Sequence, residues 1–425
     1  MRFNDGLFLA LSATCVTFLI HGCHGDNDTE SLYFYVTSQT SDIITPVPNW
    51  MDMMHVGVSA FIVNLNEFNQ LSGELVLTLV FNTTWFDSNI HWNPYDFGGK
   101  NYLMVKTNDI WMPQLSFRQS FDSLQSLNIK DARAHVYPNG LVEWFTGNVL
   151  HAVCSVDATY FPFDTQICPV TLTSLYYTSY DLVLFSTESQ ILQHYYTENS
   201  QWRYLKGEIV ENESELNPEL TFVFHFKRRA EFFIVYIIMP VVFLSHLNLL
   251  VFVMPVSFGE RSSVAITTFL SFVVYMQIVN QHVPPSSQPT PYIFYYLMFV
   301  MAYSSTIMCL CIVSLKIHSR DTPVPKYARI IGTYAFGRGI RYLLCKPKAI
   351  SDTIRPRHDS GESITDNVDT RDELTNSEKQ EKKLDVEWTM LGSLFDKLCL
   401  VCLLLIYWAS SLITCYQLYN NTGIY

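Results

Sequence analysis

Apolar residues follow two different patterns along this chain of 425 residues, and the pattern changes after Lys227-Arg228-Arg229. From about 54 to 227, short runs of alternating or β-branched residues are separated by turn signals such as Pro138-Asn139-Gly140. Such runs predict β-strands, and many short strands are typical of a β-sandwich. After the basic triplet, the apolar stretches become as long as a bilayer-spanning helix requires. The pattern therefore predicts an all-β, immunoglobulin-like antiparallel sandwich followed by a four-helix transmembrane bundle.

The predicted membrane helices share this length and apolar character: three lie within 230–318, at 230–256, 260–283 and 291–316, and the fourth lies within 385–419. The last of these begins as a cytoplasmic helix that leads into the span. Lys and Arg crowd the first half of the polar loop 319–384, which the positive-inside rule places in the cytoplasm. Asp, Glu, Ser and Thr dominate 351–383, so this part is predicted to be a disordered linker. Four crossings put both chain ends outside the cell, with 420–425 as an extracellular tail.

The first 25 residues resemble a secretory signal peptide, with Arg2 followed by the apolar stretch Leu7 to Ile20 and small residues near Gly25. The alternative is a membrane anchor, but this stretch is shorter than the ~20 residues that a span needs. The extracellular domain is therefore predicted to span 26–229. Within it, Cys154 and Cys168 stand alone in an oxidising compartment and are expected to form one disulfide. Acceptor motifs for glycosylation, which are also common by chance, begin at Asn27, Asn82, Asn212 and Asn420.

Composition excludes several classes of function. The formal net charge of −12 argues against nucleic acid as a partner, because phosphate binding needs clustered Lys and Arg. The sequence has no metal-ligand spacing, nucleotide-binding loop or nucleophile arrangement, and His194 and His246 are isolated. We therefore expect neither an enzyme nor a cofactor.

The second predicted span carries a polar stripe. Residues three or four apart share one face of a helix, and here that face begins polar and becomes apolar midway. The face consists of Glu260, Ser263, Thr267, Leu270, Val274, Gln277 and Gln281. A polar stripe is costly against lipid, so it is expected to face a water-filled path that several copies enclose. A ring of Glu260 carboxylates would favour cations, and apolar rings of Leu270 and Val274 would gate the path. Alternatively, Glu260 and Arg261 only mark the end of the helix and pair with each other or with neighbours.

The segment Cys154-Ser-Val-Asp-Ala-Thr-Tyr-Phe-Pro-Phe-Asp-Thr-Gln-Ile-Cys168 resembles the disulfide loop of Cys-loop receptors. Further matches are Trp85-x-Asp87 with Trp92-Asn93-Pro94, Trp111-x-Pro113, Lys227-Arg228-Arg229 with Pro240, and Gly259-Glu260-Arg261. The last motif lacks an inserted Pro-Ala and is similar to the cation-selective nicotinic and serotonin branch. The resemblance implies a subunit of a homo-pentamer or of a hetero-pentamer with related subunits, held in plasma-membrane lipid and conducting cations.

The same resemblance implies which residues couple ligand binding to the gate. They are Glu67, Phe68, Phe161, Pro162, Phe163, Asp164, Arg228, Arg229 and Pro284. Phe161 to Phe163 could be sandwich core, but a Pro between two aromatic residues in a tight loop is better interpreted as a contact surface.

In nicotinic receptors an aromatic cage at the subunit interface binds a quaternary ammonium by cation–π attraction. By resemblance, its positions are occupied here by Val80, Arg118, Leu175, Tyr176 and Tyr177. Arg118 would repel an ammonium group, while the others offer apolar and stacking surface. The hairpin 207–218 also lacks the family's adjacent cysteine pair. Acetylcholine is therefore not expected to be the agonist.

A retained gate with a rewritten pocket is similar to the cephalopod chemotactile receptors, which respond to poorly soluble molecules. A small hydrophobic ligand is therefore expected. Two alternatives stay open: an accessory subunit of a heteromer that binds no ligand, and a channel for a conventional transmitter with Arg118 pairing a carboxylate.

Overall fold

A computed structural model describes residues 27–49, 51–129, 132–212, 216–255, 260–283, 290–320 and 368–421. The signal peptide, Pro284 and most of the loop 319–384 lie outside the described residues. The chain divides into two compact units, Met1–Ala230 with His282–Pro289 and Glu231–Gln281 with Thr290–Tyr425. Each unit has an architecture of its own.

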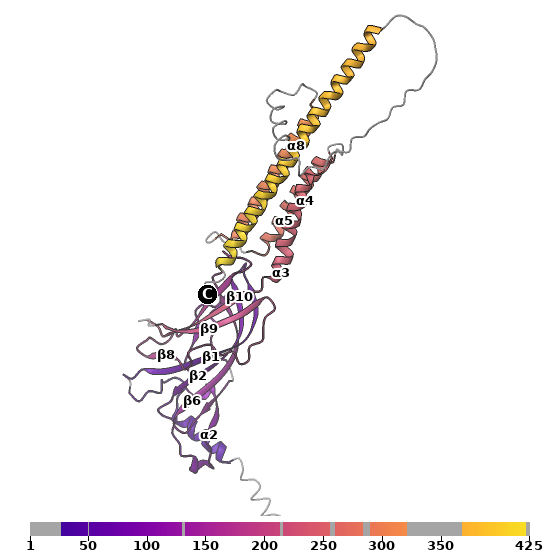
Figure 1. Cartoon of the computed structure of the whole chain (residues 1–425). Coiled ribbons are helices and arrows are strands. Elements are labelled where there is room, and N and C mark those ends of the chain that lie inside the picture. The colour runs from indigo at the N-terminus through magenta and orange to yellow at the C-terminus, as the bar shows by residue number, and fades with distance from the viewer. Residues whose placement is uncertain are drawn as a thin grey trace, which may run out of the picture. The chain divides into compact units, whose positions relative to one another are not determined.

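The first unit is a two-sheet β-sandwich (Figure 1). One sheet has six strands in the order β3-β5-β6-β2-β1-β8, and the other has four in the order β4-β7-β10-β9. The strands are β1 Met54–Asn69, β2 Glu74–Phe86, β3 Leu103–Lys106, β4 Ser116–Phe117, β5 Arg133–Val136, β6 Leu141–Val153, β7 Thr165–Thr173, β8 Leu182–Ser186, β9 Trp202–Asn212 and β10 Glu219–Arg228. The pairing of β1 with β8 is parallel, so the prediction of a purely antiparallel sandwich was wrong at this edge.

The two sheets enclose one apolar core. Period-2 alternation puts every second residue of a strand on the inner face. The Phe81 ring lies 5.5 Å from that of Phe117 and 5.6 Å from that of Phe222, so both sheets contribute to the centre. All three side chains are fully buried, and burial of each contributes about 1.5–3 kcal/mol to folding.

The hairpin between β5 and β6 depends on a glycine. Gly140 has φ +86°, a left-handed conformation that favours glycine, and its amide donates to the Tyr137 carbonyl at 3.0 Å. A Cβ at this position would lie 2.5 Å from the Asp87 carbonyl oxygen. Two short 3-10 turns, η1 Pro94–Phe97 and η2 Thr107–Asp109, also connect strands of this unit.

The helix α2 Asn27–Gln39 precedes the sandwich, and the sequence analysis did not predict this helix. Asp28 and Glu30 lie in its first turn, where negative charge is favourable. Leu32 and Val36, four residues apart, share one face and are fully buried in the sandwich core. The apolar run Leu32 to Val36 is short, and only Leu32 and Val36 within it are fully buried, so the sequence analysis did not recognise a helix there.

Among its described residues, the second unit contains four helices that are long and apolar enough to cross a membrane. The first, Glu231–Phe252, joins α3 Glu231–Phe233, the π-helical η3 Ile234–Ile238, α4 Met239–Leu249 and the 3-10 turn η4 Leu250–Phe252. The others are α5 Arg261–Asn280, α6 Tyr292–His318 and Trp388–Leu418 within α8 Val368–Asn421 (Figure 1).

Pro240 explains the π-helical turn η3 in the first of these helices. Proline has no N–H to bond the carbonyl four residues earlier, which belongs to Tyr236. The hydroxyl of Tyr275 in α5 donates to that carbonyl instead. A side chain of the neighbouring helix thus satisfies the backbone group, as an apolar environment requires.

The long helix α8 begins at Val368, whereas a disordered linker was predicted through 383. From 368 to 391 the sequence contains neither Gly nor Pro, and Glu378 precedes Lys382 by four residues, which favours a helix. Polar composition alone therefore misled the prediction, because a polar segment without helix breakers can extend an adjoining helix.

Candidate functional site

The disulfide loop is attached to the end of β10 by a buried ion pair. Cys154 and Cys168 are joined as a disulfide, with a Cα–Cα distance of 5.2 Å. Within this loop, Asp164 accepts from Arg228 Nε at 2.6 Å and from its Nη2 at 2.7 Å. Gln166 Nε2 also donates to Asp164, at 2.5 Å. Both charged side chains are almost completely buried, so the pair is bidentate and shielded from solvent.

Aromatic rings surround the same guanidinium. Its carbon lies 4.3 Å from the Trp202 ring centroid and 4.9 Å from that of Phe161, both within cation–π range. Phe68 at the end of β1 packs on Trp202 at 5.0 Å. Segments from β1, β9, β10 and the disulfide loop therefore meet at Arg228. The sequence analysis missed Trp202, because it lies opposite Arg228 only through the pairing of β9 with β10.

The prediction that Phe161 to Phe163 form a contact surface needs correction. Phe161 and Pro162 are buried, and Phe163 alone of the three is half-exposed. Phe68 is a core residue of the sandwich, and neighbouring Glu67 is exposed on β1, before the turn that leads to β2. Aromatic residues beside a proline in a tight loop can fill the space around a buried charge as well as present a surface.

Arg229 differs from Arg228 in its surroundings. Its Nη2 donates to Glu198 at 2.5 Å, and the Glu198 side chain is largely exposed. An exposed pair of this kind is screened by solvent and contributes little to stability. Arg228 is therefore expected to contribute more to the stability of the domain than Arg229, the adjacent residue of the basic triplet.

The predicted ligand residues lie on opposite outer surfaces of the sandwich. Because Phe81 and Phe117 meet in the core, their neighbours Val80 and Arg118 point outward from the six-stranded and the four-stranded sheet, respectively. One subunit thus does not bring these two side chains into a single pocket. Two copies, each contributing one surface, would be needed.

Arg118 already has a carboxylate partner inside the chain. Its guanidinium pairs with Glu219 at the start of β10, while half of the Arg118 side chain stays exposed. Its backbone amide donates to the Thr171 carbonyl at 2.9 Å. The expectation that Arg118 repels a cation or binds a ligand carboxylate assumed an unpaired charge, and the Glu219 pair largely neutralises it.

The turn after β7 separates the other three predicted ligand residues. Leu175 is 57 % exposed and Tyr176 is 79 % exposed. Tyr177 turns inward, and its hydroxyl accepts from Trp111 Nε1 at 3.1 Å. Only Leu175 and Tyr176 therefore offer open surface, and Tyr177 packs against the core as a partner of Trp111.

Two predicted glycosylation acceptors have their side-chain nitrogens engaged. Asn82 Nδ2 on β2 donates to Glu143 at 3.0 Å, and Asn212 Nδ2 donates to Thr221 at 2.7 Å. Asn212 is exposed, whereas Asn82 is half-buried. A glycan on Asn82 would have to displace its hydrogen bond to Glu143. The side chain of Asn27 lies outside the described part of the chain.

The predicted stripe of the second span is exposed along its entire length. Each of its seven members is exposed in the single chain: Glu260, Ser263, Thr267, Leu270, Val274, Gln277 and Gln281. Buried residues of α5, among them Ala265 and Phe272, lie on the opposite side. The helix therefore packs through one face and leaves the polar-to-apolar stripe open.

Arg261, next to Glu260, is fully buried and has its own partners. Its Nη2 lies 2.9 Å from Asp396 of α8, and its Nε donates to the Val251 carbonyl at 2.6 Å. Ser314 of α6 accepts from Nη1 at 3.2 Å and donates to Asp396 at 2.5 Å. The sequence analysis left open whether Arg261 pairs with Glu260 or with a neighbour. In the structure Arg261 pairs with Asp396, which the sequence analysis did not single out.

Comparison with known proteins gives matches in both units. The ligand binding domain of neurotransmitter-gated ion channels matches residues 29–230, and the transmembrane region of the same channels matches residues 237–333. Together they cover well over half of the chain. The chain belongs to the neurotransmitter-gated ion-channel family. Members of this family are ligand-gated ion channels in the plasma membrane rather than enzymes, and their amino-terminal domain is extracellular, as predicted.

Acetylcholine receptor subunits are among its relatives. The delta subunit of Mus musculus is 27 % identical over 84 % of this chain and 71 % of its own length. The neuronal alpha-2 subunit of Gallus gallus is 26 % identical over 71 % of this chain, and the alpha-like subunit of Manduca sexta is 27 % identical over the same share. The chain spans 58 % and 61 % of the lengths of these two.

Proposed function

We propose that this member of the neurotransmitter-gated ion-channel family is a subunit of a pentameric, cation-selective channel opened by small, poorly soluble apolar ligands at the subunit interface. The observation that carries the proposal is the open stripe of α5, which runs from Glu260 through polar residues to Leu270 and Val274. Five such stripes around an axis would give a carboxylate ring for cations and apolar rings for the gate. The family relationship supports a pentamer.

The outer surface around Val80 supports an apolar ligand. Val80 on β2 lies opposite Phe61 on β1 and Gly147 on β6, and Asn82, two residues on, lies opposite Phe145. Phe145 is about half exposed, and Phe61 and Val80 are partly exposed on the same outer face. Opposed to the exposed Leu175 and Tyr176 of a second copy, this surface would form an apolar pocket.

The electrostatics at Arg118 fit the same ligand class. Because Glu219 neutralises Arg118, the surface offers no strong unpaired charge at this position for a carboxylate transmitter. The relatives named as acetylcholine receptor subunits share the family, but three of the five cage positions here, Val80, Arg118 and Leu175, have no aromatic ring to attract an ammonium ion. We therefore infer a chemotactile or chemosensory role and insensitivity to acetylcholine.

Coupling to the gate would run through the cluster at Arg228. The disulfide loop and the end of β10, which leads toward the first membrane helix, are joined there by the pair with Asp164. A movement of the loop would then be transmitted to the end of β10 rather than absorbed in a flexible contact.

Expression of this chain alone tests the proposal. Whole-cell currents would be recorded with acetylcholine and with a panel of terpenoid, steroid and aromatic compounds. Currents with the apolar panel and not with acetylcholine are expected. Silence with both, with surface expression confirmed, would favour an accessory subunit of a heteromer, and a response to acetylcholine would contradict the ligand assignment.

A pair of matched variants locates the ligand. Leu175→Asp places a charge on the proposed apolar surface and should shift the dose-response curve to higher concentration at unchanged surface expression. Leu124→Asp is the control, because Leu124 is also 57 % exposed but lies in the segment between β4 and β5. Equal shifts in both variants would place the site elsewhere.

A further inference from the structure

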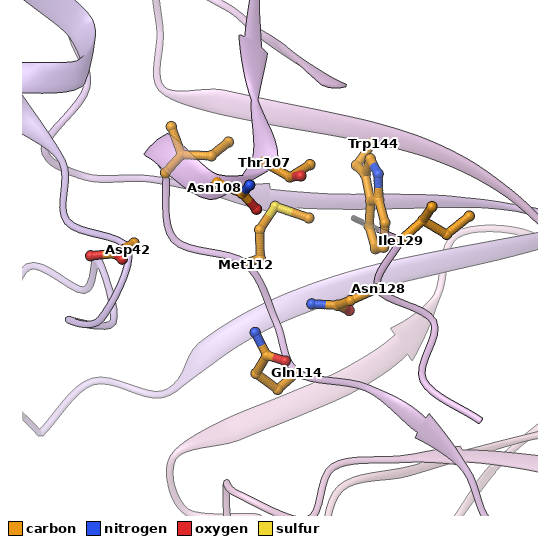
Figure 2. A pocket seen from close by; sticks show the side chains of 9 residues that line it. Asp42, Thr107, Asn108, Met112, Gln114, Asn128, Ile129 and Trp144 are labelled. Carbon is orange, nitrogen blue, oxygen red and sulfur yellow. The ribbon is translucent and has the colours of Figure 1, made fainter. Parts of the chain in front are cut away.

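A cavity of about 470 Å³ lies in the first unit (Figure 2). Its walls come from the segment that follows η2, from the residues before β5 and from β6. In Figure 2, Met112 occupies the middle of the view, with Trp144 on one side and Asp42 on the other. Neither Leu175 nor Tyr176 is among the lining residues, so the cavity is not part of the proposed ligand surface.

The hairpin between β9 and β10, in contrast, lies directly beside that surface. Asn217 Nδ2 donates to the Ser174 carbonyl at 2.6 Å, and the Ser179 amide donates to the Leu216 carbonyl at 3.3 Å. These two bonds attach the start of β10 to the segment that contains the exposed Leu175. Whatever the hairpin carries is therefore held next to the proposed ligand surface.

Asn212, the last residue of β9, is exposed at this place. It lies opposite Glu219 on β10, which in turn lies opposite Thr173 on β7. Neighbouring strands are about 4.8 Å apart, so the Asn212 Cα lies about 10 Å from the Thr173 Cα. Leu175 follows Thr173 by two residues. A large group on Asn212 would therefore extend over the surface around Leu175.

Asn212 also has the sequence and the surroundings that a glycan requires. Asn212-Glu213-Ser214 is an acceptor sequence for N-glycosylation, and the amino-terminal domain of the family is extracellular. The Asn212 amide donates to the Thr221 hydroxyl at 2.7 Å, and that hydroxyl also bonds the Thr171 hydroxyl at 2.9 Å. Thr221 would thus keep a partner if the modified amide moved away.

Asn82 is less suited to the same modification. It lies within β2, between β1 and β6, and its side chain is half-buried and bonded to Glu143. Val80, two residues earlier, points from the same outer face. A bulky glycan on Asn82 would lie on the surface proposed to meet a second copy.

We propose that Asn212 carries an N-linked oligosaccharide, which borders the ligand surface and limits the size of the ligands that reach it. The oligosaccharide comes from a polyprenyl diphosphate donor. Asn212 Nδ2 forms the bond to the anomeric carbon and loses one proton, and the diphosphate leaves with the electron pair of the bond that breaks. Because a glycan is bulky, it excludes large ligands from the surface around Leu175 and Tyr176, while small apolar ligands pass. This role at the ligand surface rests on the function proposed above.

Matched variants at Ser214 test the modification on the full-length receptor purified from animal cells. Ser214→Ala destroys the acceptor sequence without changing Asn212, whereas Ser214→Thr keeps it. Treatment with a peptide N-glycosidase should remove one oligosaccharide more from the wild type and from Ser214→Thr than from Ser214→Ala, as measured by mass spectrometry. An equal loss from all three would overturn the proposal.

The rate of thiol modification tests where the glycan lies. Leu175→Cys places a thiol on the proposed ligand surface. Methyl methanethiosulfonate is the small reagent, and a maleimide on a polyethylene glycol chain is the bulky one. Ser214→Ala should raise the rate with the bulky reagent several-fold and leave the rate with the small reagent unchanged. Ser214→Thr should change neither rate.

Leu124→Cys is the matched control for position. Leu124 and Leu175 are both 57 % exposed, but Leu124 follows β4, and β4 and β9 form opposite edges of the four-stranded sheet. The wild-type chain, whose exposed free cysteines include Cys309, Cys402 and Cys415, gives the background rate. If the melting temperature shows that Ser214→Ala does not fold, glycosidase-treated receptor with Ser214 intact takes its place.

An unchanged rate with the bulky reagent at Leu175→Cys, or an equal rise at Leu124→Cys, would overturn the role of the glycan at the ligand surface. Labelling needs no agonist, so these outcomes do not depend on whether apolar ligands open the channel. Absence of ligand-gated currents together with the expected labelling would instead contradict the proposed function alone.

Discussion

The side chain of Arg228 makes more contacts than that of Arg229, the next residue of the basic triplet. A buried guanidinium is tolerated only when its hydrogen bonds and its charge are matched. Here Asp164 does both, and the Trp202 and Phe161 rings lie within cation–π range. Arg229 lies one residue further and has a single exposed partner. Burial, rather than residue type, therefore determines what each arginine contributes.

Replacing Arg228 by Ala should destabilise the extracellular domain strongly. The substitution leaves the Asp164 carboxylate buried without its partner, which costs about 3–5 kcal/mol. Arg229→Ala is the matched control and should cost less than about 1 kcal/mol, because its partner is exposed. Surface labelling and the melting temperature of the purified receptor measure both. Similar effects of the two variants would contradict this account of the pair.

His225 on β10 makes stability sensitive to mild acid. Burial is the main cause that lowers its pKa below the usual 6.5; Lys206 lowers it further, and Glu208, at 3.8 Å, opposes the shift. The neutral form is thus favoured in the folded state, whereas the unfolded chain takes up a proton near pH 6.5. Stability is full above that pH and is lost as pH falls below it toward the lowered pKa.

Replacing His225 by Gln should flatten this dependence. The fall in melting temperature of the receptor between pH 7.5 and pH 5.5 should be smaller in His225→Gln than in the wild type. His194→Gln is a suitable control, since His194 is exposed. An unchanged fall in the His225 variant would show that other groups cause the acid sensitivity.

At the scale of elements, polar contacts hold the membrane helices to one another. The Tyr275 hydroxyl of α5 donates to the Tyr236 carbonyl, four residues before Pro240. Arg261 of α5 joins the end of the first helix, α6 and α8 through Val251, Ser314 and Asp396. In apolar surroundings such groups have no water to replace a lost partner. These contacts therefore specify which helix faces meet.

Replacing Asp396 by Asn should disrupt this arrangement more than replacing Ser314 by Ala. Asp396→Asn leaves a buried guanidinium without its counter-charge, for which about 3–5 kcal/mol is expected. Ser314→Ala removes hydrogen bonds to two charged groups but leaves their ion pair in place, so a smaller loss of about 1.5–3 kcal/mol is expected. The fraction of receptor that reaches the cell surface, measured against total protein, should follow this order. The reverse order would show that the Arg261–Asp396 pair does not hold α8 in place.

At the scale of the whole molecule, one chain leaves a polar stripe open in a helix that is apolar enough to span a membrane. Lipid is a poor neighbour for Glu260 and Gln277, which supports the proposal that further copies of the same helix surround a water-filled axis. A ligand site that includes both Val80 and Arg118, as proposed, would also need two copies, because these residues lie on opposite outer surfaces of one sandwich. Both features are properties of an assembly rather than of one subunit.

Replacing Glu260 by Ala should reduce the ratio of cation to anion permeability of the assembled channel. A carboxylate within about 4 Å of a passing ion contributes about 1 kcal/mol in water, so loss of the ring should lower the ratio about fivefold or more. Reversal potentials in asymmetric salt measure it. Glu231→Ala, an exposed carboxylate at the start of α3, should leave the ratio unchanged. If the two variants behave alike, Glu260 does not form the selectivity ring.

The sequence determined the features that depend on local period and length. Alternation between 54 and 227 predicted strands, apolar length predicted the spans, and helical spacing alone grouped Glu260 with Gln281, because these patterns need no knowledge of what lies nearby. The disulfide was predicted because Cys154 and Cys168 stand alone in the segment assigned to an oxidising compartment, and the structure contains it. The helix α2 was not predicted because its apolar run, Leu32 to Val36, is short and continuous and shows no helical period.

Only the tertiary structure decided which distant groups meet. Glu219 neutralises Arg118, Tyr177 turns inward to Trp111, and Asp396 reaches Arg261, each across many residues of chain. The cavity beside Trp144 likewise forms from segments that no motif connects. Such pairings depend on how sheets and helices pack against one another, and a local pattern of apolar and polar positions contains no information on that packing.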